Sequence, residues 1–440
     1  MKLFVLGGGP AGLAVSQEVS ENGQDFTLIE ANKTLGGLAQ SLPWKNYGLH
    51  DLGPHKIFTT DKNLEKKILS ILPKSSWIEN VKSSKVYIEG HYLPYPPSPF
   101  SLIGVYGFIE FLKMSLSALL KKFTFFKASQ IDSFENDLVS RLGKPVYNKL
   151  FKPTALKLWG EPQKLSSKLS QGRVQTPSIT ELILRLMKIQ KTSSFEALTF
   201  KYPKGGLSEI WKKIEDNSKR NGNYLKNSRI VKIDHENKRI NKITYETENE
   251  LKEIDVSNDF VASTIPISNL LLSMGTNVPS EIIKDSNEII QLNDLNLIFF
   301  CIEEKILFEE SWIFVPDPKI LFHRVSEQNS FDPDMVKEGS IVCCEVMMNT
   351  EEKRSLSDED LLNNVASDLK EVSNKRFNIV DSKLIKLPKS YPVYLKGYEP
   401  KLKRIIDYLD SFENLKTIGR QGSFNYIGTL DAMDIGYGFG

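Results

Sequence analysis

The chain has 440 residues, of which 40% are hydrophobic and 25% are charged, so it is long enough for two or three domains with substantial cores. Its formal net charge of +2 gives no global field that would predict a nucleic-acid partner. Its three cysteines (Cys301, Cys343 and Cys344) form neither a CxxC pair nor a Cys/His spacing. We therefore expect no metal site and a reducing compartment. Because no signal peptide fits before the glycine turn at residue 7, we expect a cytoplasmic protein.

Residues 3–30 predict a strand, a helix and a second strand. The apolar run 3–6 leads into a glycine turn, the helical pattern that follows stops at Asn22-Gly23, and FTLIE at 26–30 is typical of a buried parallel strand. This is a βαβ unit of the kind that binds nucleotides.

The turn has the spacing Gly7-x-Gly9-x-x-Gly12. Gly7 permits the tight turn, Gly9 lets the backbone approach a pyrophosphate, and Gly12 allows close helix packing. The helix N-terminus favours the phosphate charge. Glu30, at the end of the second strand, can accept hydrogen bonds from ribose hydroxyls and would repel a 2′-phosphate, so FAD or NAD is preferred over NADP.

The middle of the chain predicts a hairpin at Glu89-Gly90 and then helices from about 103 to 192. The apolar segment 104–126 is interrupted by Glu110, Lys113, Lys121 and Lys122, which argues against a transmembrane helix. We expect an amphipathic helix packed against the rest of the protein. A position on a membrane surface is the alternative.

The second half returns to strand patterns. Residues 223–247 predict a strand–turn–strand pair, and 296–400 predict several strands with one strong helix at 357–372. Ser357 is a suitable N-cap for that helix.

A second glycine pair, Gly36-Gly37, follows Glu30 in LIEANKTLGGLAQS. The glycine motif, the acid and this pair together resemble the FAD enzymes that include amine oxidases, protoporphyrinogen oxidases, phytoene desaturases and UDP-galactopyranose mutases. The resemblance implies an α/β fold with a discontinuous Rossmann-type FAD-binding domain (1–75, 200–265 and 405–440). A helical substrate lobe (103–195) and a mixed β-sheet domain (76–102 and 290–400) would complete it.

Segments along most of the chain look like the UDP-galactopyranose mutases, especially the eukaryotic type. YGLHDLGPHKIF (47–58) is similar to the segment whose histidine lies against the isoalloxazine, here His55. YLPYPPSPF (92–100) places Tyr95 near the nucleotide. In LFKPTALKLWGEPQKLSSKLSQGRV (150–174), Trp159 and Arg173 match, and Arg173 would contact the substrate phosphate. A salt bridge on the surface or within the lobe is the alternative for Arg173.

The later segments extend the resemblance. KYPKGGLSEIW (201–211) supports the fold, and Val231 falls where a backbone clamp on adenine is expected. SWIFVPDPKILFHRV (311–325) brings a second phosphate arginine to Arg324, and SYPVYLKGYE (390–399) brings a phosphate-binding phenol to Tyr391. IGRQGSFNYIGTLDAM (418–433) implies Arg420 beside the flavin, Tyr426 at the diphosphate and Asp431 near the ribityl or pyrophosphate.

Three sets of residues collect these expectations. The predicted catalytic residues are His55, Arg173, Arg324, Tyr391 and Tyr426. The predicted cofactor-binding residues are Gly7, Gly9, Pro10, Ala11, Gly12, Glu30, Gly37, Leu38, Ala39, His55, Val231, Gly419, Arg420 and Asp431. The predicted substrate-binding residues are Tyr95, Trp159, Arg173, Arg324, Tyr391 and Tyr426.

Arginines hold a diphosphate with two-pronged hydrogen bonds, and tyrosines add oriented donors. By resemblance, N5 of reduced FAD attacks the anomeric carbon of a nucleotide sugar, and the sugar ring opens and recloses between pyranose and furanose with no net redox. Such a mutase would serve surface-polysaccharide synthesis. NADH or NADPH would reduce the flavin, although no second Rossmann fingerprint is found. A homo-oligomer is left open.

Some positions depart from the mutase pattern. A family asparagine falls at Ala155, a family tyrosine falls at Phe314, and Ile427-Gly428-Thr429 replace acidic or amide residues. The nucleotide or the sugar therefore need not be those of UDP-galactose. Two alternatives stay open: an FAD-dependent oxidase or desaturase of the amine oxidase or protoporphyrinogen oxidase type, and a flavin-binding protein without catalysis.

Overall fold

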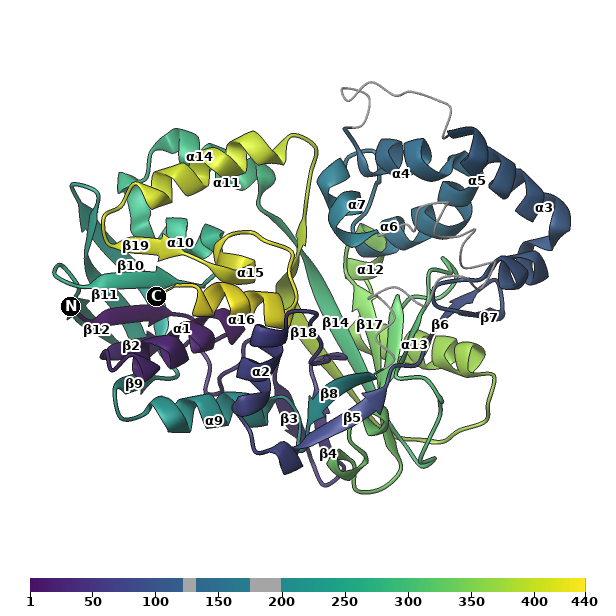
Figure 1. Ribbon diagram of the computed structural model, residues 1–440, viewed down its shortest axis with the longest axis horizontal. Helices are drawn as coiled ribbons and strands as arrows, with labels where there is room; N and C mark the ends of the chain where they lie inside the picture. Colours follow the sequence, from purple (N-terminus) through teal and green to yellow (C-terminus); the bar gives the residue numbers. More distant parts are fainter. Residues whose placement is uncertain (122–131, 175–198, 440) are drawn as a thin grey trace.

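A computed structural model describes residues 1–121, 132–174 and 199–439. Its first layer is a parallel five-stranded sheet with the strand order β19-β13-β1-β2-β9 (Figure 1). All four residues of β1 are buried, as expected for a central strand that is covered on both faces. The predicted α/β fold, with its Rossmann-type sheet assembled from distant segments, is confirmed. The strands are β1 (Leu3–Leu6), β2 (Phe26–Ile29), β9 (Gly222–Leu225), β13 (Phe260–Ser263) and β19 (Leu415–Thr417).

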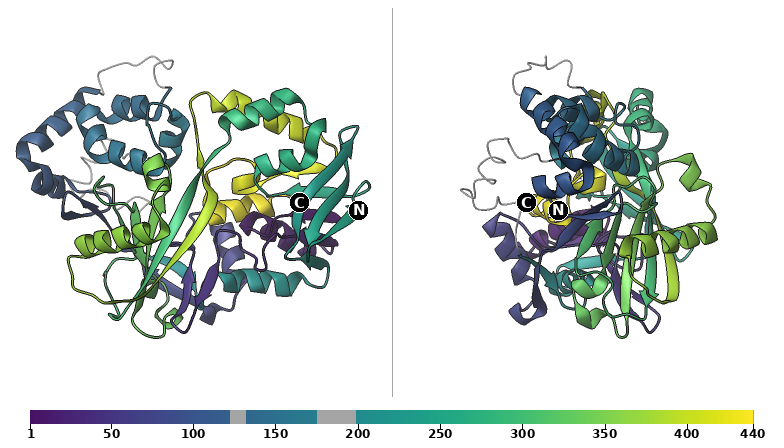
Figure 2. Two further views of the ribbon diagram at one scale, coloured as in Figure 1. Left: turned by 180° about the vertical axis from the view of Figure 1, so that it is seen from behind. Right: turned by 90° about the vertical axis from the view of Figure 1, so that its right-hand side faces the viewer.

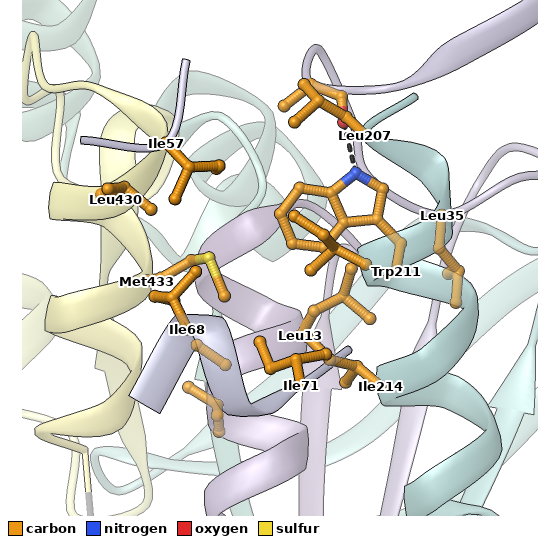
Figure 3. Close-up of a cluster of buried hydrophobic side chains, with 14 of the residues drawn as sticks. Leu13, Leu35, Ile57, Ile68, Ile71, Leu207, Trp211, Ile214, Leu430 and Met433 are labelled. Carbon is orange, nitrogen blue, oxygen red and sulfur yellow. Dashed lines mark hydrogen bonds between the residues drawn. The ribbon is translucent and has the colours of Figure 1, made fainter. Parts of the chain in front are cut away.

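One face of this sheet is covered by helices that bury a core around Trp211 (Figure 3). Leu13, Ile68, Ile214 and Met433 contribute to this core from four different helices. The chain therefore needs its N-terminal, central and C-terminal segments together to complete the unit. The helices are α1 (Pro10–Glu21), α2 (Lys62–Ser70), α9 (Ser208–Ser218) and α16 (Thr429–Tyr437).

A second core joins β1, β2 and β13 to an antiparallel three-stranded sheet and three helices. The hairpin predicted within 223–247 is present, and it turns at Asn237 and Lys238, which both have left-handed backbone. Residues 267–289, which lie outside the domain bounds predicted from the sequence, pack here. These elements are β10 (Arg229–Glu236), β11 (Arg239–Thr247), β12 (Glu250–Asp255), α10 (Ile267–Met274), α11 (Ser280–Ile289) and α14 (Tyr398–Asp410).

A mixed seven-stranded sheet has the order β18-β14-β17-β16-β15-β6-β7, and α13 (Asp358–Ser373) packs into its core (Figure 1). Ser357 caps α13 by accepting a hydrogen bond from the backbone N–H of Asp360, as predicted. The strands are β6 (Ser84–Ile88), β7 (His91–Pro94), β14 (Gln291–Ile302), β15 (Trp312–Phe314), β16 (Arg324–Glu327), β17 (Ser340–Met347) and β18 (Ile379–Val393), and the short helix α12 (Glu351–Arg354) follows β17.

Two small antiparallel sheets lie between the large ones. One pairs β3 (Ser41–Trp44) with β4 (Gly48–Asp51), and the other pairs β5 (Trp77–Val81) with β8 (Thr199–Pro203). We had expected residues 77–81 in the mixed β-sheet domain. Their pairing with β8, more than a hundred residues away, is a long-range choice that local sequence does not encode.

The helical lobe forms one end of the molecule (Figures 1 and 2). Its Lys157 is buried and donates to the carbonyls of Val315 (2.6 Å) and Phe322 (2.8 Å), which ties the lobe to the mixed sheet. The helix expected near 180–190 lies outside the described residues. The lobe contains α3 (Pro99–Lys121), α4 (Phe134–Leu142), α5 (Lys144–Val146), a π-helical turn (Tyr147–Phe151), α6 (Lys152–Leu158) and α7 (Ser167–Arg173).

The expectation that α3 packs against the rest of the protein holds for one side of the helix, which contacts α4 and α5, but most of its apolar side chains are left uncovered by the described residues. Only 6% of the apolar window within Pro99–Leu120 is buried. By length and composition alone this helix could also cross a membrane, which the charge count had argued against. Gly107, with φ of 80° and ψ of 161°, interrupts its helical backbone.

Candidate functional site

The glycine turn between β1 and α1 has the geometry that a dinucleotide site requires. A Cβ on Gly12 would lie 2.0 Å from the carbonyl oxygen of Gly7, so only glycine permits this approach of helix to turn. A Cβ on Gly9 would meet nothing within 4 Å. The space in front of Gly9 is thus free for a ligand at the N-terminus of α1.

The second glycine pair lies against the first. The N–H of Gly36 donates to the carbonyl of Gly8 at 2.8 Å, and a Cβ on Gly37 would lie 3.2 Å from Cα of Gly9. The carboxylate of Glu30 accepts hydrogen bonds from the N–H groups of Gly8 (2.7 Å) and Asn32 (2.8 Å). Glu30 therefore braces the turn, and its contact with a ribose stays a prediction.

Two further predicted cofactor residues come from later segments of the chain. A Cβ on Gly419 would lie 2.8 Å from Cβ of Ala11, so the C-terminal segment closes directly over α1. Val231 falls at a β-bulge, where the pairing of β10 with β11 slips between Ile230 and Lys232. Its backbone is thereby left out of the ladder, as a clamp on adenine would need.

The remaining predicted cofactor residues differ in setting. Pro10 begins α1, Leu38 is half-buried, and the carbonyl of buried Ala39 accepts a hydrogen bond from Nε1 of Trp211. Asp431 is exposed and accepts a hydrogen bond from the N–H of Gly428 at 2.9 Å, which caps α16. Its contact with a ribityl chain or pyrophosphate stays a prediction.

The loop after β4 carries His55. Its Nδ1–H donates to the carbonyl of Gly53 at 3.0 Å, which leaves Nε2 as an acceptor. Burial, together with the charges of Arg324 and Arg420, lowers the pKa of His55 to about 4. His55 is therefore a neutral imidazole at pH 7, facing two guanidinium groups.

Tyr426 lies between two guanidinium groups. The Cζ atom of Arg173 is 3.6 Å from the centre of the Tyr426 ring, and that of Arg420 is 4.8 Å away. Tyr391 meets the same ring edge-on at 5.5 Å, and Trp159 does so at 6.4 Å. Five predicted residues, taken from three distant segments, thus converge on one place.

The charges in this cluster are not neutralised by acids. Among the described residues, no carboxylate forms an ion pair with Arg173 or Arg420. Nη2 of Arg173 donates to the carbonyl of Tyr426, and Nη1 of Arg420 donates to that of Ile427 at 2.9 Å. Nε of Arg420 is buried without a hydrogen-bond partner. Two cations with neutral partners leave a net positive site for an anion.

Arg324 differs from the other two arginines because it has an acidic partner. Its Nε and Nη2 donate to the two carboxylate oxygens of Glu345 at 2.5 and 2.8 Å, and Glu345 is buried. Burial opposes the charge of Arg324, but Glu345 outweighs it and raises the pKa of the guanidinium. If Arg324 binds a phosphate, as predicted, it would do so with the N–H groups that do not contact Glu345.

Tyr95 lies at the edge of the cluster rather than within it. It is 49% exposed, and its ring packs 4.8 Å from that of Phe314. Phe314 in turn pairs with Arg324 across β15 and β16. Tyr95 therefore reaches the site through Phe314, the position where a family tyrosine was expected.

Sequence reasoning missed two supports of the site. Glu345 was not singled out, although it interrupts the apolar run IVCCEVM of β17. Its carboxylate lies 3.7 Å from where a Cβ on Gly53 would be. Asp51 is buried and accepts hydrogen bonds from Tyr202 (2.6 Å) and Ser41 (2.5 Å). Asp51 fixes the start of the His55 loop. A buried acid within a strand pattern was the signal available for both.

Comparison with known families agrees with this geometry. A family model described as flavin containing amine oxidoreductase matches residues 10–385. The chain belongs to this family. The predicted family resemblance is confirmed, and the protein is a flavin-dependent enzyme of the amine oxidase superfamily.

Several solved structures share the fold of this chain. Reduced UDP-galactopyranose mutase superposes with a TM-score of 0.84 at 20% identity, over 99% of this chain and 92% of that one. A putative protoporphyrinogen oxidase from Exiguobacterium sp. 255-15 gives 0.75 at 16% identity, over 99% and 97%. Putrescine oxidase bound to putrescine gives 0.67 at 12% identity, over 99% and 98%.

The residues present fit the flavin cofactor that this family implies. The free space before Gly9, the contact of Gly37 with Gly9 and the closure of Gly419 over Ala11 form a backbone cradle for a pyrophosphate. His55 and Arg420 would lie toward the flavin ring. The helix N-terminus supplies the positive end that a dinucleotide phosphate favours.

Proposed function

We propose that this flavoprotein is a mutase that interconverts the pyranose and furanose rings of a nucleotide sugar. The observation that carries the proposal is the position of Tyr426 between the guanidinium groups of Arg173 and Arg420, next to Tyr391. A nucleotide diphosphate needs such a set of cations and phenols. An amine or porphyrinogen substrate has no comparable use for two cations that have no acidic partner among the described residues.

Each side chain then has a distinct task. Arg173 would stabilise the negative charge that develops on the diphosphate as its bond to the anomeric carbon breaks, and Arg420, beside the flavin, would add to the positive potential there. Tyr391 and Tyr426 would donate hydrogen bonds to its oxygens. Burial raises the pKa of Tyr426 to about 12, so its phenol keeps its proton at pH 7. When bound and reduced, the flavin would supply the nucleophile for the anomeric carbon.

His55 would lie on the flavin side of the site, and Arg324 would be the second arginine that binds the phosphate. Neutral Nε2 of His55 can accept a hydrogen bond, and the Glu345-bound guanidinium of Arg324 keeps a fixed orientation. NADH or NADPH is the proposed reductant. The reaction as a whole transfers no electrons.

Titration with UDP tests the proposal. We expect UDP to change the flavin fluorescence of the purified enzyme, and Arg173→Ala to weaken this binding roughly 10- to 100-fold, as for lost charged hydrogen bonds. Arg239→Ala is the matched control, because Arg239, on β11 of the three-stranded sheet, forms an ion pair with Glu413. If no nucleoside diphosphate produces a response, and the enzyme makes peroxide with amines or porphyrinogens, the chain is an oxidase.

A further inference from the structure

The outer helix of the lobe presents apolar side chains to solvent. In α3 beyond Gly107, six large apolar residues are between 45% and 71% exposed. A soluble surface rarely keeps so many of them together without a partner. The residues of this patch, which we call the α3 patch, are Phe108, Ile109, Leu112, Leu116, Leu119 and Leu120.

The α3 patch follows one face of the helix, since its members recur at spacings of three and four residues. The opposite face is the one that packs. Met114 is 3% exposed. Ser117 lies against Gly143, where a Cβ on the glycine would be only 2.2 Å from Oγ of Ser117. The helix is therefore anchored to the lobe by one side and open on the other.

Charge and position favour one kind of partner. Residues 99–174 contain twelve Lys and Arg but only five Asp and Glu, although the net charge of the whole chain is only +2. α3 lies at the extreme end of the molecule in two views, so a flat surface can approach it (Figures 1 and 2). An apolar helix face within a basic lobe is complementary to an anionic lipid bilayer.

We propose that the α3 patch docks the protein on the surface of an anionic membrane. The helix lies in the interface and does not span it. From Gly107 to Lys121 it is only about 21 Å long at the usual rise per residue, shorter than the roughly 30 Å hydrocarbon core. Glu110 and Lys113, paired at 2.6 Å, would remain at the level of the headgroups.

Vesicle flotation tests this proposal. The full-length protein is mixed with vesicles of phosphatidylcholine alone, or with about 30% phosphatidylglycerol added. We expect flotation with the anionic vesicles and at least roughly tenfold less binding for the variant Phe108→Ser/Leu112→Ser/Leu116→Ser. The matched control is Leu251→Ser/Leu272→Ser, which removes two equally exposed leucines elsewhere and should float like the wild type.

A label at the patch distinguishes the other occupants. All three native cysteines are buried, so a Leu112→Cys variant can take a polarity-sensitive dye at one site. We expect the dye emission to shift to the blue when anionic vesicles are added. Absence of flotation, or no shift with vesicles, overturns the proposal. If sedimentation instead shows a dimer that dissociates in the triple variant, a second copy of the chain covers the α3 patch. If neither vesicles nor a second copy bind, another segment of the chain covers it.

Discussion

The two glycines of the nucleotide turn have opposite roles, and a pair of alanine variants separates them. In Gly12→Ala the new Cβ would lie 2.0 Å from the carbonyl oxygen of Gly7 and 3.2 Å from Cγ1 of Val5, so α1 must move away from the sheet. Overpacking of this kind costs about 1–3 kcal/mol. We expect the Tm of the flavin-free protein to fall by roughly 2–10 °C.

In Gly9→Ala the new Cβ meets nothing within 4 Å, and the φ of −77° at Gly9 suits alanine. The fold should therefore keep its Tm. The methyl group would occupy the space that the pyrophosphate needs. We therefore expect FAD to bind roughly 10- to 100-fold more weakly, which corresponds to a loss of about 1.4–2.8 kcal/mol in binding free energy.

The assay titrates flavin-free protein with FAD by fluorescence quenching, alongside thermal unfolding of both variants. Gly12→Ala should lower both the FAD affinity and the Tm, because the whole turn moves. An unchanged FAD affinity in Gly9→Ala would falsify the placement of the cofactor at this turn.

Three further predictions concern buried charges. Glu345→Gln removes the buried acid partner of the half-buried Arg324 and should lower the free energy of unfolding by about 3 kcal/mol in urea titrations. Asp358→Asn, in an exposed ion pair with Lys386, should change it little, and equal effects of the two variants would contradict this. The pKa of His55 is lowered to about 4 in the folded protein, so the unfolded chain takes up the proton more easily. The contribution of His55 to stability is therefore present above pH about 6.5 and is lost as pH falls toward 4. NMR of labelled histidine should show His55 neutral at pH about 5.5, and a charged His55 at that pH would refute the geometry. Burial lowers the pKa of Lys157 to about 7, so the free energy of unfolding should rise with pH from about 7 to 10.5. Lys157→Met should abolish that rise. A rise of the same size in the variant would count against the assignment to Lys157.

The nucleotide-binding unit could be predicted from sequence because its signals are local. Gly12 must be glycine because of its contact with the carbonyl of Gly7, only five residues earlier, and the strands on either side are continuous apolar runs. The convergence of Arg173, Tyr391 and Tyr426 depended on the family resemblance, since no spacing in the chain brings together residues so far apart.

What the sequence did not predict depends on long-range pairing and burial. The pairing of β5 with β8 and the ion pair of Arg324 with Glu345 join segments whose local patterns are compatible with other partners. The exposure of α3 was missed for a related reason. An apolar helix has the same sequence pattern whether protein or another phase covers it.

The central claim is that the site acts on a nucleotide sugar, and one measurement tests it directly. The dithionite-reduced enzyme is incubated with UDP-, GDP- and dTDP-hexopyranoses, and the products are separated by chromatography. We predict a furanose isomer of at least one of these sugars, formed only by the reduced enzyme and without net oxidation of the flavin. If no sugar nucleotide is isomerised while the enzyme oxidises an amine or a porphyrinogen, the account is contradicted.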